Sequence, residues 1–365
     1  MMGGATATPA PYGGHRTPHG GAPAMRRRSE ADTPRREVAP SLRALFGGEV
    51  AGAALSAGDG KTGARLERVQ VGGRWYVCKH LHLADDWVMR ASGDLGIRAV
   101  QVWKDGWLDR LPAAIDHTMV AAAWDERPEG RGAVLVMHDV VDHLVPEGDT
   151  PLPLEQHRRF VEHMARLHAA FWDAPPAPAL LPMSTRLLLF GPGLGVTERA
   201  RGGRDPVPTE LVPEGWRRLR ERAPNAAAVV ADLLADPTPL LDGLAATPQT
   251  LLHGDWKAGN LGSHPDGRTI LLDWAVPGVG PGCYDLAWYA CLNQARLPET
   301  KAATFDRYRA ALERNGIDTT GWWARQLALS LLALLLNFGW EKALGDDAEL
   351  AWWVGQVPAA QGWLP

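Results

Sequence analysis

Alternating apolar and polar positions predict a small β-sheet in the first part of the chain. Residues 64–71 and 74–81 have the two-residue period of half-buried strands, and Gly72-Gly73 between them is typical of a tight hairpin turn. Residues 133–137 form a short apolar run that predicts a further strand. Together these segments indicate a strand-rich lobe over residues 41–140.

Helical spacing of apolar positions dominates the rest of the chain. Apolar residues recur at intervals of three and four positions, which predicts helices over residues 85–111, 157–172, 215–244 and 300–316. The apolar run 327–336 is shorter than the roughly 20 residues needed to cross a bilayer, so it is interpreted as a buried helix. We therefore expect an α+β chain whose antiparallel-sheet N-terminal lobe is followed by a larger, mostly helical C-terminal lobe over residues 141–365.

Two segments lack both periodicities. Residues 1–40 are rich in Gly, Ala, Pro, Thr and Arg, and we expect them to be disordered because they cannot bury enough apolar surface to offset the entropy of ordering. Residues 175–213 are dense in Pro and Gly, which is typical of a surface segment. We expect a cap that faces a bound substrate over residues 175–250.

Charge and cysteine content narrow the possible partners. The 365 residues carry a formal net charge of −4 with scattered basic positions, so nucleic acid is not an expected partner. The three cysteines have no metal-ligand spacing and fit free thiols in a reducing compartment. We expect a cytoplasmic enzyme with no membrane partner, and the sequence leaves its oligomeric state open.

The strongest chemical signal is the strip that begins at His253. Here Asp255 and Asn260 stand in the pattern HxDxxxxN, and Asp273 follows an apolar run. Phosphoryl transfer needs a carboxylate that accepts the proton of the acceptor hydroxyl, and oxygen ligands that hold Mg²⁺ against the phosphates. One loop could supply both. The alternative is that these side chains only cap backbone groups in a turn.

The residues between Asn260 and Asp273 predict a hairpin. They contain an apolar start, the turn sequence Asp266-Gly267 and the apolar residues 269–272. Such a hairpin would return Asp273 to the side of Asn260. Two protein oxygen ligands at the ends of a hairpin suit Mg²⁺, which keeps several waters and also binds phosphate oxygens.

This strip resembles the aminoglycoside phosphotransferase and choline kinase superfamily, whose members are relatives of protein kinases. The resemblance extends over most of residues 55–293 in the order of the parts and is strong over 253–288. It implies a protein-kinase-like two-lobe fold and an ATP-dependent reaction. It also implies roles for residues of the strip: Asp255 as catalytic base, Asn260 and Asp273 as metal ligands, His253 as a loop-shaping residue and Asp285 as a brace of the catalytic loop.

Two lysines have candidate roles beside these acids. Lys257 stands two residues after Asp255, where protein kinases place a lysine that neutralises the transferring phosphoryl group; the alternative is an ordinary solvated lysine. Lys79 lies on the strand 74–81, where kinase-like folds place the lysine that binds the α- and β-phosphates; the alternative is a surface lysine on an edge strand. No glutamate occurs between Val69 and Asp125 to pair with Lys79, which departs from the family pattern.

Two further segments resemble nucleotide-binding parts of the family. The stretch 55–63 resembles the loop that covers the nucleotide, with Ser56, Gly58 and Gly60 as candidate phosphate contacts, because backbone amides approach phosphates only where side chains are small. The stretch 135–140 resembles the hinge. There, backbone groups around Met137 and Asp139 would bind the adenine edge.

The sequence therefore predicts an ATP-dependent, Mg²⁺-requiring phosphotransferase. Its acceptor would be a hydroxyl of a small polyhydroxylated metabolite or of an aminoglycoside- or nucleoside-like antibiotic, which would make antibiotic resistance one role. Two alternatives stay open: a choline or amino-alcohol kinase, which the many tryptophans permit, and a nucleotide-binding pseudokinase, prompted by the missing glutamate. The acidic cluster 346–349 keeps a cationic acceptor open without favouring one.

Overall fold

The first half of the chain forms a five-stranded antiparallel sheet. The computed structural model describes residues 36–55, 64–173 and 180–365. The strands lie in the order β1-β2-β3-β6-β5, with bounds β1 (Gly52–Leu55), β2 (Arg65–Val71), β3 (Arg74–Leu81), β6 (Gly130–His138) and β5 (Met119–Arg127). The hairpin predicted around Gly72-Gly73 is confirmed, since both glycines have positive φ angles of 57° and 77°.

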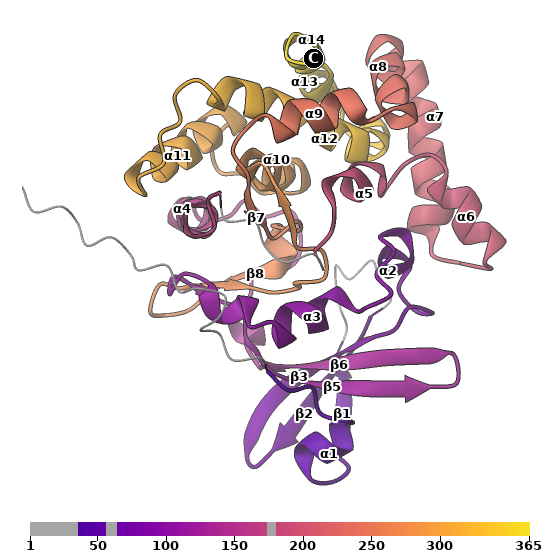
Figure 1. Cartoon of the computed structure of the whole chain (residues 1–365), viewed down its shortest axis with the longest axis vertical. Helices are drawn as coiled ribbons and strands as arrows, with labels where there is room; N and C mark the ends of the chain where they lie inside the picture. The colour runs from indigo at the N-terminus through magenta and orange to yellow at the C-terminus, as the bar shows by residue number, and fades with distance from the viewer. Residues whose placement is uncertain (1–35, 56–63, 174–179) are drawn as a thin grey trace, which may run out of the picture. The chain divides into compact units, whose positions relative to one another are not determined.

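The two faces of this sheet pack against different partners. Helix α1 (Leu42–Phe46) covers one face, where Cys78 and Val136 form a small apolar cluster with Leu45 (Figure 1). Because successive side chains on a strand point to opposite faces, Lys79 points away from α1. Leu135, which pairs with Lys79, belongs to the main core and marks the face that Lys79 shares.

The prediction of one continuous helix over residues 85–111 is wrong. The segment folds into α2 (Trp87–Ala91), α3 (Arg98–Lys104) and the 3₁₀ turn η2 (Trp107–Arg110). Gly93, Ile97 and Gly106 between these elements have positive φ angles of 62°, 52° and 65°, which an α-helix cannot accommodate. Apolar spacing continues across the breaks because all three elements bury one face in the same core.

The prediction that residues 1–40 are disordered is wrong for residues 36–40. Residues 36–40 are described, and Ala39 forms a parallel bridge with Ala123. The Ala39 amide donates to Ala122 O at 2.9 Å, and the Trp124 amide donates to Ala39 O at 2.9 Å. Strand β5 lies at the sheet edge, and an edge strand has backbone groups that any extended segment can pair with. Residues 1–35 lie outside the described part of the chain.

The second half is mainly helical, as predicted, and the α+β class is confirmed. Its helices are α4 (Leu154–Ala170), α5 (Met183–Leu188), α6 (Leu194–Ala200), α7 (Val212–Arg222), α8 (Pro224–Ala235), α9 (Thr238–Ala245), α10 (Gly282–Leu292), α11 (Lys301–Arg314), α12 (Trp323–Leu344), α13 (Asp347–Val354) and α14 (Val357–Gln361). Short turns are η3 (Val141–His143), the π-helical η4 (Val207–Leu211), η5 (Ala258–Asn260) and η6 (Gln294–Arg296). The short strands are β4 (Ile115–Asp116), β7 (Thr250–Leu252), β8 (Leu261–Ser263), β9 (Thr269–Leu271) and β10 (Gly278–Gly280).

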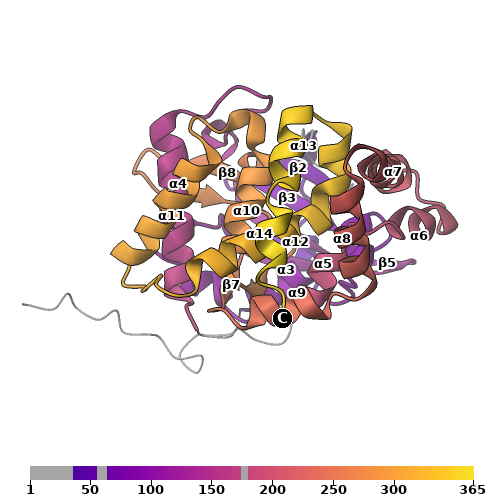
Figure 2. The same ribbon diagram turned by 90° about the horizontal axis from the view of Figure 1, so that it is seen from above.

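Helix α12 is the central helix of this half. It packs against α7, α10, α13 and α14 (Figure 2). With 22 residues it is longer than the predicted run 327–336, and by length and composition alone it could cross a membrane. However, 78% of its most apolar window is buried inside the fold, which is typical of a core helix.

The pair α7 and α12 approaches very closely at Gly215. A Cβ atom at this position would lie 2.2 Å from Trp340 O and 2.6 Å from its carbonyl carbon. Backbone atoms of a packed helix cannot move aside as a flexible side chain can. The glycine therefore sets the separation of the two helices.

Replacing Gly215 with Ala should destabilise the protein by about 2 kcal/mol, because overpacking against backbone outweighs the ~1 kcal/mol that alanine contributes to helix propensity. Urea unfolding followed by circular dichroism measures the change. Gly193→Ala is the matched control, since its added Cβ would meet no atom within 4 Å. Equal stability of both variants would contradict the close approach.

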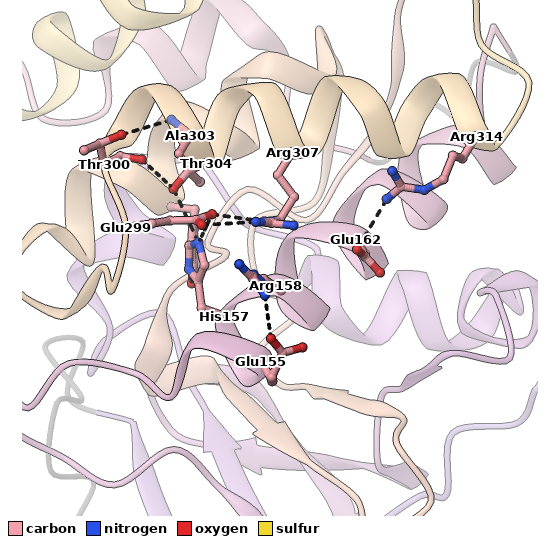
Figure 3. Close-up of polar contacts among 11 residues, drawn as sticks. Glu155, His157, Arg158, Glu162, Glu299, Thr300, Ala303, Thr304, Arg307 and Arg314 are labelled. Carbon is pink, nitrogen blue, oxygen red and sulfur yellow. Dashed lines mark hydrogen bonds and ion pairs between the residues drawn. The ribbon is translucent and has the colours of Figure 1, made fainter.

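A buried polar cluster joins α4 to α11. His157 is fully buried, and its ring nitrogens form hydrogen bonds with the hydroxyl of Tyr289 at 2.8 Å and with Glu299 Oε1 at 3.1 Å. Arg307 on α11 holds the same glutamate through two bonds of 3.0 and 3.1 Å (Figure 3). Burial lowers the pKa of His157 despite the neighbouring Glu299, so the ring is neutral at pH 7.

This pKa predicts a stability that depends on pH. Below the unfolded-state value of about 6.5, the unfolded chain takes up a proton that the folded His157 resists, so stability is lost as pH falls toward the lowered folded pKa. A His157→Gln variant should be less stable at pH 7.5, and its deficit relative to wild type should narrow by pH 5.5. Melting temperatures at both pH values test this, and a constant deficit would contradict it.

Candidate active site

Two short strand pairings hold the strip from His253 to Asp273: β7 with β10, which flank it, and β8 with β9, which lie within it. The catalytic loop follows β7, which pairs with β10. The predicted hairpin is confirmed, with Leu261 on β8 opposite Leu271 on β9. At its open end the Leu272 amide donates to Asn260 O at 2.9 Å. Asn260 and Asp273 therefore emerge side by side from the same end of the hairpin.

Three donors hold the carboxylate of Asp255. Oδ2 accepts a hydrogen bond from the Asn260 amide nitrogen at 2.8 Å and lies 3.0 Å from Lys257 Nζ. Oδ1 accepts from the indole N–H of Trp288 at 3.0 Å. Donors to both oxygens fix the orientation of the carboxylate. This is an oriented acceptor that could receive a proton from a neighbouring hydroxyl.

Trp288 is a functional candidate that the sequence interpretation missed. It lies on α10, is 4% exposed and stands three residues after Asp285. Residues three apart on a helix share a face. Since Asp285 was already predicted to contact the catalytic loop, this spacing could have identified Trp288.

The carboxylate of Asp285 binds the backbone at the start of the loop that contains Asp255. Its carboxylate accepts the backbone N–H of His253 at 2.7 Å and that of Gly254 at 3.0 Å, and it lies 3.4 Å from His168 Nε2. Burial raises the pKa of Asp285, but His168 and His253 outweigh it and the pKa lies below its ordinary value. These contacts are the bracing that the family resemblance implied. His168 also bonds to the Tyr308 hydroxyl at 2.5 Å and is a satisfied structural histidine.

His253 connects the catalytic loop to the end of the hairpin. Its ring is fully buried, and Nε2 bonds to Leu272 O at 2.9 Å. Burial lowers the pKa of His253, which keeps the ring neutral. Its other ring nitrogen, Nδ1, accepts the backbone N–H of Asp255 at 3.3 Å, so both ring nitrogens bind backbone groups, which matches a loop-shaping role.

Lys79 from the sheet meets Asp273 from the hairpin. Lys79 Nζ lies 2.6 Å from Asp273 Oδ1. Burial alone would raise the pKa of Asp273, but Lys79, with further help from Lys257, holds it below its ordinary value. Asp273 has a φ of 63°, a left-handed conformation rarely adopted by residues other than glycine, asparagine and aspartate. Such strained positions cluster at functional sites.

The structure shows how Lys79 is paired without a glutamate. Of the three aspartates near the predicted helix, Asp85 pairs with Arg127 and Asp94 lies 3.7 Å from Arg98. Asp86 is 5% exposed and caps α2 by accepting from the Val88 and Met89 amides. Burial raises the pKa of Asp86 to about 6, with Lys79 lowering it and Asp273 raising it. In the described part of the chain, the direct ion pair of Lys79 is with Asp273.

Of the residues predicted to bind the nucleotide through the covering loop and the hinge, only those of the hinge lie in the described part of the chain. Ser56, Gly58 and Gly60 lie outside the described residues. Met137 lies inside β6, paired with Val77 on β3 and with Met119 on β5. Asp139, just after the strand, forms an ion pair with Arg68 at 2.5 Å and lines a cleft of about 1040 Å³. The roles of Met137 and Asp139 in binding adenine stay predictions.

The residues at the hairpin end suit a magnesium ion that is shared with phosphates. Because the Asn260 amide nitrogen donates to Asp255, its oxygen is the group that can face a cation. The Asp273 side chain is 27% exposed and accessible. The described residues contain no group of three or more His, Cys, Asp or Glu that could hold a metal by themselves. Two oxygens fit Mg²⁺ only when phosphates and waters complete its shell.

Comparison with protein families identifies the chain. A model described as "Phosphotransferase enzyme family" matches residues 104–323, which is more than half of the chain and includes the strip 253–288. The chain belongs to the phosphotransferase enzyme family. Its recognition as a phosphotransferase from the HxDxxxxN strip is thereby confirmed, as is its class as a small-molecule kinase.

Several solved structures are similar to this phosphotransferase. They include the choline kinase LicA from Streptococcus pneumoniae (12% identity, 87% of this chain and 96% of that chain, TM-score 0.49) and an aminoglycoside-3′-phosphotransferase of type VIII (21%, 81% and 97%, 0.47). A microcompartment-associated aminopropanol kinase is also similar (14%, 86% and 90%, 0.45). Comparison with curated proteins gave no match.

Replacing Trp288 with Phe should reduce kcat for phosphoryl transfer about tenfold, because Asp255 loses one of the donors that orient it, a contribution of about 1.4 kcal/mol. The KM for the nucleotide should not change. Release of ADP from Mg·ATP, with water as acceptor, measures both. Trp340→Phe is the control, because the buried Trp340 indole N–H has no hydrogen-bond partner within the described residues. An unchanged kcat in Trp288→Phe would contradict the orienting role.

Proposed function

We propose that this phosphotransferase transfers the γ-phosphoryl group of ATP to a hydroxyl of a small polyhydroxylated metabolite or antibiotic, with Mg²⁺ as the metal. The observation that carries the proposal is the arrangement around Asp255. Its carboxylate is oriented by Asn260 and Trp288, and Asn260 is tied across the hairpin to the segment that ends in Asp273. Proton acceptor and candidate metal ligands therefore share one rigid unit.

In this mechanism each side chain has one task. Asp255 accepts a hydrogen bond from the acceptor hydroxyl and orients its oxygen toward the γ-phosphorus. It takes the hydroxyl proton as the new oxygen–phosphorus bond forms and the bond from the γ-phosphorus to the β,γ-bridging oxygen of ATP breaks, releasing ADP. Lys257, 3.0 Å from that carboxylate, places positive charge beside the transferring group. Asn260 and Asp273 would hold Mg²⁺, which neutralises charge on the phosphates.

Lys79 completes the nucleotide end of the site. It lies on β3, on the sheet face turned away from α1, and meets Asp273 at 2.6 Å. In the proposal this ammonium binds the α- and β-phosphates, while Asp273 turns to the metal. The ion pair supports this step because it already places the cation that binds phosphate beside the carboxylate that binds metal.

The aromatic surroundings of the base do not distinguish the proposed acceptor classes. Trp288 packs edge-to-face on Phe338, with ring centroids 4.8 Å apart, and Phe338 contacts Phe190 at 5.1 Å. All three rings are buried in the main core, so they support Trp288 from behind and offer no open face to an acceptor. The second candidate, a choline or amino-alcohol kinase, needs an aromatic or acidic cage for the cation, which these buried rings do not supply.

The acidic cluster near the C-terminus does not favour a polycationic aminoglycoside. Asp346 caps α13, Asp347 pairs with Arg222, and Glu349 pairs with Lys301 at 2.6 Å and accepts the Trp353 indole N–H. These carboxylates hold the C-terminal helices together.

The three buried free cysteines support the proposal of a cytoplasmic enzyme.

A coupled ADP-release screen with Mg²⁺ tests the function across aminoglycosides, nucleosides, sugars and amino alcohols. Asp255→Asn should lower turnover of the best acceptor at least 1000-fold, since it loses the base while keeping the shape of the side chain. Its binding of ADP, measured by calorimetry, should be unchanged.

Asp266→Asn is the matched control, because Asp266 lies in the exposed turn of the hairpin, and it should keep full activity. Retained turnover in Asp255→Asn would remove the base assignment. Nucleotide binding by the wild type without transfer to any acceptor would support the pseudokinase instead.

A further inference from the structure

Arg186 is a charged side chain buried where charge is costly. It lies on α5 in the segment predicted to form the cap and is 1% exposed. Within the described residues no carboxylate lies at ion-pair distance from it, and its Nε has no hydrogen-bond partner. A buried guanidinium without a carboxylate partner is destabilising unless backbone acceptors satisfy it.

Its two terminal nitrogens donate to two segments of the active site. Nη1 donates to Gly254 O at 3.3 Å, and Nη2 donates to Val276 O. Gly254 immediately precedes Asp255, and Val276 follows Asp273 by three residues. The planar guanidinium group of Arg186 therefore bridges the segment that carries the proton acceptor and the segment that carries the candidate metal ligand.

Two glycines leave the space that the Arg186 guanidinium group occupies. A Cβ atom at Gly254 would lie 2.3 Å from Nη1, and one at Gly278 would lie 2.7 Å from Nη2. Gly254 also has a φ of 82°, which other residues rarely adopt. The glycine between the histidine and the aspartate of the catalytic strip is thus required both by its backbone conformation and by Arg186.

The backbone of Arg186 is itself held in place by the helical core. The Asn337 amide on α12 donates to Arg186 O at 2.8 Å and to Leu187 O at 3.2 Å. Its oxygen accepts the Tyr284 hydroxyl at 2.5 Å, and the Arg186 guanidinium lies 5.5 Å from the Tyr284 ring. Helices α10 and α12 therefore set where α5 presents the guanidinium.

We propose that Arg186 is a positioning residue for phosphoryl transfer, which holds Asp255 and Asp273 in register from the cap. This inference rests on the proposed function. An arginine can do this because its planar fork makes two separated, directed bonds, whereas a lysine ammonium is a point donor. Misplacement of a catalytic group by about 1 Å can reduce the rate about 100-fold.

The test compares Arg186→Lys and Arg186→Met with wild type, using ADP release from Mg·ATP with water as acceptor. We expect kcat to fall about 100-fold in both variants, while the Kd for ADP, measured by calorimetry, changes less than threefold. In Arg186→Ala, millimolar methylguanidinium should restore part of kcat by occupying the vacated slot.

Arg222 provides the matched control. It also donates to two backbone carbonyls, those of Ala343 and Gly345, but at the C-terminal end of α12. Arg222→Lys and Arg222→Met should keep kcat within twofold, and methylguanidinium should not affect them. An equal loss of kcat in the Arg222 variants, or an unchanged kcat in folded Arg186→Lys, would overturn the proposal.

Hydrogen–deuterium exchange separates this inference from the proposed function. Exchange in Arg186→Lys should increase in both 253–260 and 274–278, with 301–314 on α11 unchanged as an internal reference. If the wild type transfers phosphate from Mg·ATP to no acceptor of the screen, the proposed function fails while exchange still tests the bridge. Unchanged exchange in both segments would overturn the role of Arg186.

Discussion

The carboxylate of Asp285 is the interaction on which the catalytic half of this phosphotransferase depends. It is fully buried and accepts the backbone N–H groups of His253 and Gly254, the two residues before the proposed base. A buried carboxylate is stable only when donors satisfy it, so the fold must keep both amides and His168 in place. The entry of the chain into the catalytic loop is thereby fixed from α10.

From this anchor the site is built outward by short connections. Trp288, one helical turn after Asp285, orients the carboxylate of Asp255. Asn260 bonds to the same carboxylate, and the hairpin that begins there returns the chain to Asp273. Lys79 then joins the hairpin to the sheet. These contacts link α10, the loop after His253, the hairpin and the sheet in one continuous series.

Prediction from sequence succeeded where the signal was local. The turn at Gly72-Gly73 and the hairpin between Asn260 and Asp273 depend on residues close in the chain, and both are confirmed. The single helix over 85–111 was wrong, because apolar spacing reports which side chains are buried and not whether the backbone continues unbroken. Strand β5 was missed because Ala121, Ala122 and Ala123 have low strand propensity, and Ala122 and Ala123 are buried only through their position in the sheet.

The sequence by itself determined the family, the α+β class and the candidate base and metal ligands. These follow from residue types at fixed spacings within one strip, and such spacings can be recognised in the sequence without knowledge of the tertiary contacts. Only the tertiary structure decided that Lys79 pairs with Asp273, that Trp288 orients Asp255 and that Arg186 bridges Gly254 and Val276. Lys79 and Asp273 are 194 positions apart in the chain, and Arg186 and Val276 are 90 apart. Contacts over such distances arise from the packing of the whole core, and no local pattern encodes them.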